Sequence, residues 1–382
     1  MQSDLNTLEF DAIRRALANE CASPYGKEAA RNLEPAPGLQ VAKAFQAAVS
    51  AAREGLENRD GPQLGELPDV RAALRQAAQS GASPLNGMAL RNLVTLLQTG
   101  EYLARNLEQR PQLYAGDRGD LTGASDLIDE LDAVVDTMGR VRPDASDELA
   151  RLNGEVKDKR DELNQEVRKK QKDKKLAPNL VEPKTEHYSG PRRVLAVKTE
   201  AAGSIKGVRR EALSNGRGIM VEPMEWIPLN NRLEQLAKEI DAEERRVLKA
   251  ATDSVSARRD ALQQLIDAVT WIDLALGAGR LSIKTDGVAP GLDDTPHLDL
   301  RGACHPALVA EHKNGGPAPV PLTMRLDREH PMVLITGPNT GGKTVAIKTI
   351  GLLATMAFCG LHIPVTEGSV VGSYRRILVD IG

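Results

Sequence analysis

The segment around residue 340 restricts the possible folds of this chain more than any other. It matches the pattern G-x-x-x-x-G-K-T through its residues Gly337, Pro338, Asn339, Thr340, Gly341, Gly342, Lys343 and Thr344. The apolar residues 333–335 before it predict a strand, and residues 345–358 after it predict a helix. A glycine-rich loop between a strand and a helix is the arrangement in which backbone N–H groups bind phosphates at a helix N-terminus. The sequence therefore predicts an α/β nucleotide-binding portion.

The loop side chains predict which nucleotide and which metal ion would bind. The Lys343 ammonium would neutralise charge on the β- and γ-phosphates, and the Thr344 hydroxyl would ligate Mg²⁺. We therefore predict ATP and Mg²⁺ as cofactors, with residues 337–344 as the binding residues and Thr344 as the metal ligand. The alternative interpretation is a fortuitous glycine turn that binds nothing.

An ATPase of this class also needs an acidic residue at the end of a later strand, to hold the metal ion and position water. Only 38 of the 382 residues follow Thr344, and the one acid after an apolar run among them is Asp380. We expect the chain to stop inside its ATPase domain before a catalytic element follows. Weak nucleotide binding without hydrolysis is the prediction, and no catalytic residue is assigned.

Two stretches carry apolar residues at the alternating spacing of three and four that is typical of coiled coils. The first covers residues 144–175 and is otherwise highly charged, and the second covers residues 229–276. Short β-prone segments lie between them at residues 194–197, 204–208 and 218–221. If the two arms are antiparallel, this β-rich insertion must lie at their far tip.

Helix signals elsewhere are local. Ser23-Pro24 and Ser83-Pro84 predict helix starts, and Gly277 and Gly279 predict a helix end. The predicted fold class is mainly α with an α/β P-loop ATPase portion, and the arms carry a small β-rich clamp at their tip. The predicted domains are residues 1–143 as an N-terminal helical core, 144–177 as an outgoing coiled-coil lever, 178–228 as the clamp, 229–279 as a returning coiled-coil lever, and 280–382 as the N-terminal part of an incomplete ATPase domain.

Charge is distributed unevenly along the chain. The formal net charge is −3, yet residues 168–217 hold fourteen Lys and Arg against five Asp and Glu. A basic island on an acidic protein predicts a polyanion partner, and the alternative interpretation is a solvated coiled-coil tip. The candidate nucleic-acid contacts are Lys169, Lys170, Lys172, Arg192, Arg193, Lys206, Arg209 and Arg210.

Composition excludes several other classes of protein. Aromatic residues make up 3% of the chain, which argues against a surface of many stacked bases. The three scattered cysteines form no CxxC pair, and the six histidines show no metal-ligand spacing. The sequence has neither a signal peptide nor a run long enough to span a membrane. We therefore predict a cytoplasmic protein without a membrane partner.

The loop Thr336-Gly337-Pro338-Asn339-Thr340-Gly341-Gly342-Lys343-Thr344 resembles the TGPN-x-GGK-[ST] loop of the MutS family. Further matches point to its second bacterial subfamily, which lacks the mismatch-reading and connector domains; these are Val197–Glu200, Val221-Glu222-Pro223, Leu229-Asn230-Asn231, His305-Pro306 and Gly360–Pro364. The resemblance covers essentially the whole chain, in order. Two segments depart from the subfamily pattern, namely residues 214–218 and Ala303-Cys304.

The resemblance implies an ATP-dependent clamp on nucleic acid that forms a homodimer through complete ATPase domains. It also implies suppression of homologous recombination on branched DNA, action on stalled or collided ribosomes, and endonuclease activity from a C-terminal domain that is absent here. It leaves open whether DNA or the ribosome is the main partner. Two alternatives remain, a chromosome-maintenance-like P-loop ATPase and a coiled-coil scaffold that binds a protein. The first puts its phosphate loop before the coil, whereas here the loop follows both arms.

Overall fold

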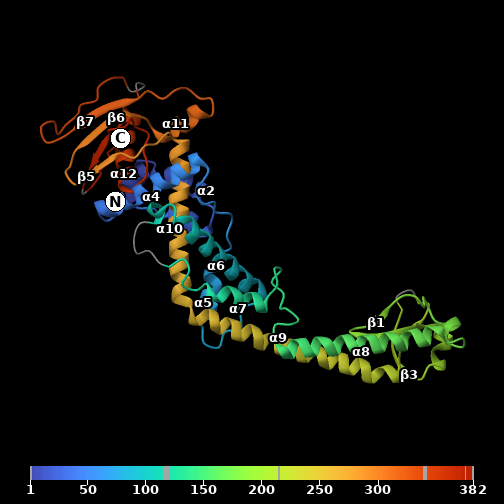
Figure 1. Cartoon of the computed structure of the whole chain (residues 1–382). Coiled ribbons are helices and arrows are strands. Elements are labelled where there is room, and N and C mark those ends of the chain that lie inside the picture. Colours follow the sequence, from blue (N-terminus) through green and yellow to red (C-terminus); the bar gives the residue numbers. More distant parts are fainter. Residues whose placement is uncertain (1, 115–119, 214–215, 339–341, 375, 381–382) are drawn as a thin grey trace. The chain divides into compact units, whose positions relative to one another are not determined.

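The computed structural model describes residues 2–114, 120–213, 216–338, 342–374 and 376–380. They form a mainly helical chain with two small four-stranded sheets (Figure 1). The chain divides into two compact units. Unit 1 comprises residues 1–78, 92–128 and 256–382, and unit 2 comprises residues 79–91 and 129–255.

Unit 1 combines helices from both ends of the chain with one sheet. Its elements are α1 (Gln2–Thr7), α2 (Phe10–Glu20), α3 (Pro24–Arg31), α4 (Leu39–Asn58), α5 (Arg71–Ala77), most of α6 (Gly87–Leu107), η1 (Pro111–Tyr114), α10 (Arg259–Lys284), β5 (Gly291–Asp293), β6 (Leu298–Ala303), α11 (Pro306–Lys313), β7 (Leu322–Leu326), α12 (Lys343–Phe358) and β8 (Val370–Gly372). The strand order is β5-β8-β6-β7, in which only the β5–β8 pair is parallel.

Unit 2 is a helix pair with a second sheet. Its elements are most of α7 (Asp126–Val134), α8 (Asp147–Lys172), η2 (Ala177–Asn179), β1 (His187–Ser189), β2 (Arg192–Val197), η3 (Thr199–Ser204), β3 (Gly207–Ala212), β4 (Ile219–Pro223), η4 (Met224–Trp226) and α9 (Ile227–Ala257). The sheet is antiparallel in the order β1-β2-β4-β3, which leaves β3 as an exposed edge strand.

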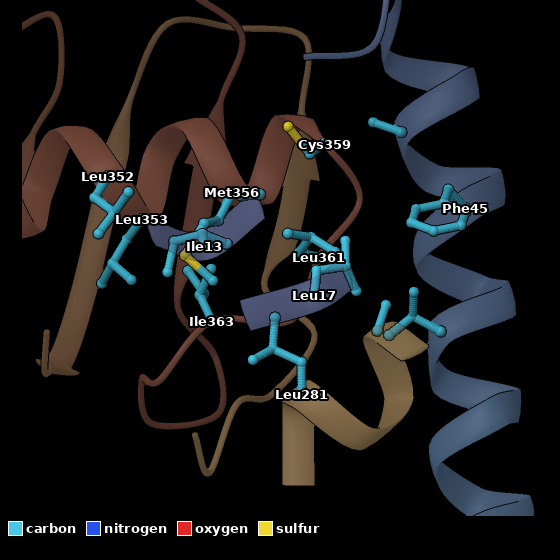
Figure 2. Packing of buried hydrophobic residues seen from close by; sticks show 14 of the residues in the cluster. Ile13, Leu17, Phe45, Leu281, Leu352, Leu353, Met356, Cys359, Leu361 and Ile363 are labelled. Atoms are coloured by element: carbon cyan, nitrogen blue, oxygen red, sulfur yellow. The ribbon is translucent and has the colours of Figure 1, made fainter. Parts of the chain in front are cut away.

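The core of unit 1 joins segments that are far apart in the sequence. Figure 2 shows Ile13 and Leu17 of α2, Phe45 of α4 and Met356 of α12 among the side chains of this cluster. Each of these four side chains is at least nine-tenths buried. Burying one such side chain contributes about 1.5–3 kcal/mol, so the cluster holds the two ends of the chain together.

A buried carboxylate fixes the turn between α2 and α3. Asp273 of α10 is fully buried, and its oxygens accept hydrogen bonds from Ala22 N (2.9 Å), Ser23 N (2.8 Å) and Ser23 Oγ (2.6 Å). The Ser23 hydroxyl oxygen in turn accepts from Gly26 N at 3.0 Å. The helix start predicted at Ser23-Pro24 is confirmed, because Ser23 is the N-cap and Pro24 the first residue of α3.

The predicted start of the helix after Ser83-Pro84 is wrong, as is the predicted end at Gly277 and Gly279. The helix expected from Ser83-Pro84 begins at Gly87 instead, and its cap is Asn86, whose Oδ1 accepts from Ala89 N at 2.8 Å.

Gly277 and Gly279 lie inside α10 and do not end it. A Cβ on Gly277 would lie 2.8 Å from Cys21 Sγ, and one on Gly279 would lie 2.9 Å from Arg53 N. These glycines therefore permit close packing of α10 on its neighbours, which composition alone does not distinguish from a helix end.

Helices α8 and α9 lie antiparallel within unit 2, with the sheet at one end of the pair (Figure 1). Ser146 caps α8, since its Oγ accepts from Leu149 N at 3.1 Å, and the same hydroxyl donates to Glu243 of α9 at 2.7 Å. Arg232 of α9 donates to both carboxylate oxygens of Glu155 at 2.6 and 2.8 Å. The apolar pattern predicted to continue to residue 276 crosses two helices, because the backbone leaves helical geometry at Arg258.

A small second core attaches the sheet of unit 2 to its helices. It contains Leu163 and Val167 of α8, Val197 of β2, Val221 of β4 and the fully buried Trp226. The strands predicted near residues 194–197 and 218–221 are confirmed as β2 and β4. The strand predicted at 204–208 begins only at Gly207, because residues 199–204 form a 3₁₀ turn.

The strand predicted before the glycine-rich loop is absent. Residues 331–336 have no regular secondary structure, and the side chains of Val333 and Leu334 are 44% and 84% exposed. The same holds for the apolar run before Asp380, where Leu378 is 74% exposed. An apolar stretch becomes a buried parallel strand only when neighbouring strands pair with it and cover its faces, and neither stretch has such a neighbour among the residues described above.

In the described ranges, no helix combines the length and the apolar character that a transmembrane span requires.

Candidate functional site

The glycine-rich loop leads directly into the N-terminus of α12. Gly342 is the N-cap residue and has a φ of 82°, and Gly337 has a φ of 144°. Both values lie in the region that favours glycine, so these two motif positions are glycine for a backbone reason. Pro338 is exposed, and Asn339, Thr340 and Gly341 lie outside the described residues.

The first turn of α12 presents donors that no helix bond uses. The first intrahelical bond at this end runs from Ala346 N to Gly342 O, which leaves the N–H groups of residues 343–345 without a helical acceptor. Lys343 is half-buried and forms no ion pair with any residue that the structure places, and Thr344 is exposed. Among the described residues, no atom outside the glycine and its chain neighbours lies within 4 Å of a Cβ built on Gly337 or Gly342.

These groups fit a nucleotide phosphate. N–H groups that no helix bond uses, an ammonium without an ion pair among the described residues and a hydroxyl are the donor set that a phosphate with Mg²⁺ needs. Lys343 and the N–H groups would hold the phosphates, and the Thr344 hydroxyl would face the metal ion that accompanies them. Within the described part of the chain, no group of three His, Cys, Asp or Glu side chains is placed to hold a metal ion by itself.

The structure separates the eight predicted nucleic-acid contacts into two sets. Five of them already pair with carboxylates: Lys169 with Glu166, Lys170 with Glu225, Arg192 with Glu222 and Glu234, Arg193 with Glu186, and Arg210 with Glu222. Lys172, Lys206 and Arg209 are exposed and form no ion pair with any of the described residues. Lys206 and Arg209 lie at the start of the edge strand β3, and Lys172 is the last residue of α8.

The paired arginines belong to a network around one buried carboxylate. Glu222 of β4 is fully buried, and its Oε1 accepts from Arg192 Nη1 and Asn230 Nδ2, both at 2.8 Å. Its Oε2 accepts from Arg210 Nε at 3.1 Å. Burial by itself would raise the pKa of Glu222. The hydrogen bonds from the two arginines and Asn230 outweigh burial and hold that pKa below its ordinary value.

Asn230 extends this network to the backbone of β2. Its Oδ1 accepts from Arg193 N and its Nδ2 donates to Arg193 O, both at 3.0 Å. Asn230 lies in the first turn of α9 and is buried. The side chain therefore fastens the sheet to the start of α9.

Sequence reasoning did not identify Glu222, Asn230 and Glu234 as partners of the basic residues. Glu222 belongs to a segment that matters in the sequence only for its family resemblance, and Asn230 also lies at the start of the predicted returning coiled-coil stretch. The pairing of Arg192 with Glu222 depends on the register of β2 and β4, in which Leu195 lies opposite Val221. That register was not available from charge counts.

Comparison with curated proteins finds relatives along the whole chain, all of one name. No family model matches the chain. It is 32% identical over 382 residues to a protein named endonuclease MutS2 from Symbiobacterium thermophilum, an alignment that covers 99% of this chain and 46% of that protein. It is similar to proteins of the same name from Thermomicrobium roseum (33% over 405 residues, 99% of this chain and 48% of that protein) and Halothermothrix orenii (29% over 392 residues, 100% and 48%). The chain spans about half the length of the curated relatives it matches.

Proposed function

We propose that the chain is an ATP-dependent nucleic-acid clamp of the MutS2 type, with the nucleotide at residues 337–344 and the nucleic acid at the tip of unit 2. Its similarity to proteins named endonuclease MutS2 over 99–100% of its length supports this proposal. The observation that carries the proposal is the junction of the loop with α12, where Lys343 has no ion-pair partner among the described residues. The domains predicted from the sequence, with residues 144–177 and 229–279 as coiled-coil levers around the clamp, are part of this proposal.

Titration of a fluorescent ATP analogue with Mg²⁺ tests the nucleotide site. Lys343→Ala should weaken binding at least tenfold, which is about 1.4 kcal/mol, and should leave the helical circular dichroism unchanged. Lys348→Ala is the matched control, because it removes a lysine from the same helix one turn beyond the loop, where Lys348 pairs with Glu9. Equal affinities of wild type and Lys343→Ala would show that this loop does not bind the nucleotide.

Lys and Arg side chains without an internal ion pair are better suited than paired ones to contact the phosphate backbone of a nucleic acid. Arg192, Arg193 and Arg210 would have to leave internal carboxylates before they bound a phosphate, which costs free energy. Lys206 and Arg209 carry no such cost. We therefore propose that these two, with Lys172, supply the main contacts, and that the paired arginines mainly hold the clamp together.

The salt dependence of binding tests this assignment. Each Lys or Arg contact with a phosphate of duplex DNA contributes about 0.9 to the slope of log affinity against log salt. Lys206→Ala with Arg209→Ala should weaken binding and flatten the slope by up to about 1.8 for every DNA sequence alike. Lys157→Ala with Arg245→Ala is the matched control, since both residues are exposed on α8 and α9 without an ion-pair partner in the described structure. Identical slopes for the two double variants would refute the tip assignment.

The proposal also covers the activities of the whole protein. Its ATPase domains would pair two copies, and its client would be branched DNA during suppression of recombination, or a stalled or collided ribosome. Endonuclease activity would come from a further domain. Running the salt series on a four-way junction, on duplex DNA and on ribosomes identifies the binding partner. The variant Lys206→Ala with Arg209→Ala should bind only the true partner more weakly and with a flatter dependence on salt.

A further inference from the structure

A cleft of about 970 Å³ lies along the apolar seam of unit 2, the line on which α8 and α9 are predicted to pack as a coiled coil. Val156 and Leu163 of α8 and Leu233 and Ile240 of α9 line it. Each pair is separated by seven residues, so these are the positions at which a closed coiled coil would pack its two helices together. Here three of the four, all except Leu163, remain only half-buried. An apolar seam is therefore present along part of α8 and α9, and no described residue covers it completely.

The length of the cleft matches a short helix. Its lining on α8 extends from Asn153 to Asn164, which is about 16 Å at a rise of about 1.5 Å per residue. On α9 it extends from Leu233 to Asp241. Three helical turns of a third helix, with one apolar stripe, would fill this length.

The unpaired charges on the walls are mostly positive. Arg160 on α8 and Lys238 on α9 are exposed and have no ion-pair partner in the described ranges. Two of the three acids in the lining, Glu186 and Glu234, are already paired with arginines of β2. Asp241 remains as the third acid. An occupant with carboxylates on both sides of its apolar stripe would complement Arg160 and Lys238.

Two buried nitrogens of Arg193 at the cleft, Nε and Nη1, form no hydrogen bond with a described residue, although Nη1 lies close to Glu186. Arg193 is 5% exposed, its Nη1 lies 2.8 Å from Glu186 Oε2, and its guanidinium lies 4.9 Å from the ring centre of Tyr188. Its buried Nε has no hydrogen-bond partner among the residues that are described. A buried donor without a partner is energetically unfavourable. Because Arg193 lines the cleft, an occupant that brings an acceptor offsets this cost after a small side-chain rotation.

We propose that this cleft binds an acidic amphipathic helix of another protein. The apolar stripe of that helix would lie on Val156, Leu163, Leu233 and Ile240, as in other helix-in-groove complexes. Its flanking carboxylates would pair with Arg160 and Lys238. The cleft lining shares no residue with the phosphate loop or with Lys172, Lys206 and Arg209, so the proposal does not depend on the nucleotide site or on these three nucleic-acid contacts.

Fluorescence anisotropy with three labelled 21-residue peptides tests the proposal on the full chain. The first has leucines at heptad spacing and glutamates on the flanks, the second replaces these glutamates by lysines, and the third scrambles the first. We expect the acidic peptide to bind at least tenfold more tightly than either of the others. The scrambled peptide is essential, because it measures non-specific attraction to the basic tip.

Two variants locate the binding. Ala237 is exposed in the cleft, so Ala237→Trp fills the cleft without changing a charge and should weaken the acidic peptide at least tenfold. Arg160→Glu with Lys238→Glu should reverse the preference between the acidic and basic peptides. Lys157→Glu with Arg245→Glu makes the same charge change outside the cleft and should leave the preference unaltered.

Equal binding of the acidic and scrambled peptides would overturn the proposal, as would an affinity that Ala237→Trp leaves unchanged. Absence of peptide binding together with self-association that Ala237→Trp abolishes would assign the cleft to a second copy of the chain, and would also overturn it.

Discussion

Acidification should destabilise unit 1 through one buried histidine. His362 follows α12, and its Nε2 lies 2.9 Å from Ser50 Oγ while its Nδ1 lies 2.8 Å from Ser282 Oγ. Burial, together with the positive charge of Arg53, lowers the pKa of His362 from 6.5 to about 4. The native ring therefore stays neutral at a pH at which the ring of an unfolded chain is already protonated.

The size of the effect follows from the two pKa values. Below pH 6.5 the unfolded state binds a proton that the folded state does not, so the free energy of unfolding falls as the pH falls. The loss continues until the pH reaches the folded pKa near 4, and a difference of 2.5 pKa units corresponds to about 3 kcal/mol. About 2 kcal/mol of this is lost between pH 7 and pH 5.

Urea unfolding of wild type and His362→Gln at several pH values measures this contribution. The variant lacks the titrating group, so its destabilisation relative to wild type should be about 2 kcal/mol smaller at pH 5 than at pH 7. The chain has two tryptophans, and Trp226→Phe leaves Trp271, which packs on Phe45 in unit 1, as the only fluorescent tryptophan. Both proteins are compared in this background so that the signal reports unit 1.

A difference between the two proteins that stays constant from pH 7 to pH 5 would refute this reasoning. So would an NMR titration in which the His362 ring of the folded protein has its midpoint near 6.5. Changes in other titrating groups cancel in the comparison, because both proteins share them.

Three further substitutions test particular contacts by urea unfolding. Asp273→Asn turns an amide N–H₂ toward backbone and hydroxyl donors and should cost about 2–3 kcal/mol; a cost below about 0.5 kcal/mol would contradict its role in the α2–α3 turn. Glu222→Gln leaves two arginines beside a neutral group in the sheet of unit 2 and should cost about 3 kcal/mol, reported by Trp226; unchanged stability would show that the network is not needed to hold this sheet. Leu353→Ala removes a fully buried side chain from α12 and should cost about 2–5 kcal/mol, and a smaller loss would mean that the core of unit 1 collapses around the site.

Features set by neighbouring residues in the sequence were predictable. The cap at Ser23 needs only the residues next to it, and the helices α8 and α9 follow from their apolar spacing over seven or more turns. The glycine-rich loop was recognised from its motif, and its two described glycines, Gly337 and Gly342, have backbone angles that favour glycine. Phosphate binding at this loop stays a prediction.

Features that depend on distant partners were not predictable. Whether residues 333–335 form a strand depends on which other strands lie beside them. Whether Gly277 ends a helix or lies against Cys21 depends on how α10 packs against the start of the chain. Charge counts likewise did not separate Arg192, which is tied to Glu222, from Arg209, which is exposed without an ion-pair partner in the described structure.

The discontinuity of unit 1 has a consequence during synthesis on the ribosome. Phe45 packs in a core completed by Leu361 and Ile363, so the intervening residues must be translated before that core can close. At about 5–20 residues per second this takes roughly 15–60 s. Unit 2, whose last residue is 255, is complete well before then and can fold first. The N-terminal helices therefore keep an uncovered apolar face throughout that interval, which makes the nascent chain a substrate for chaperones that shield such faces.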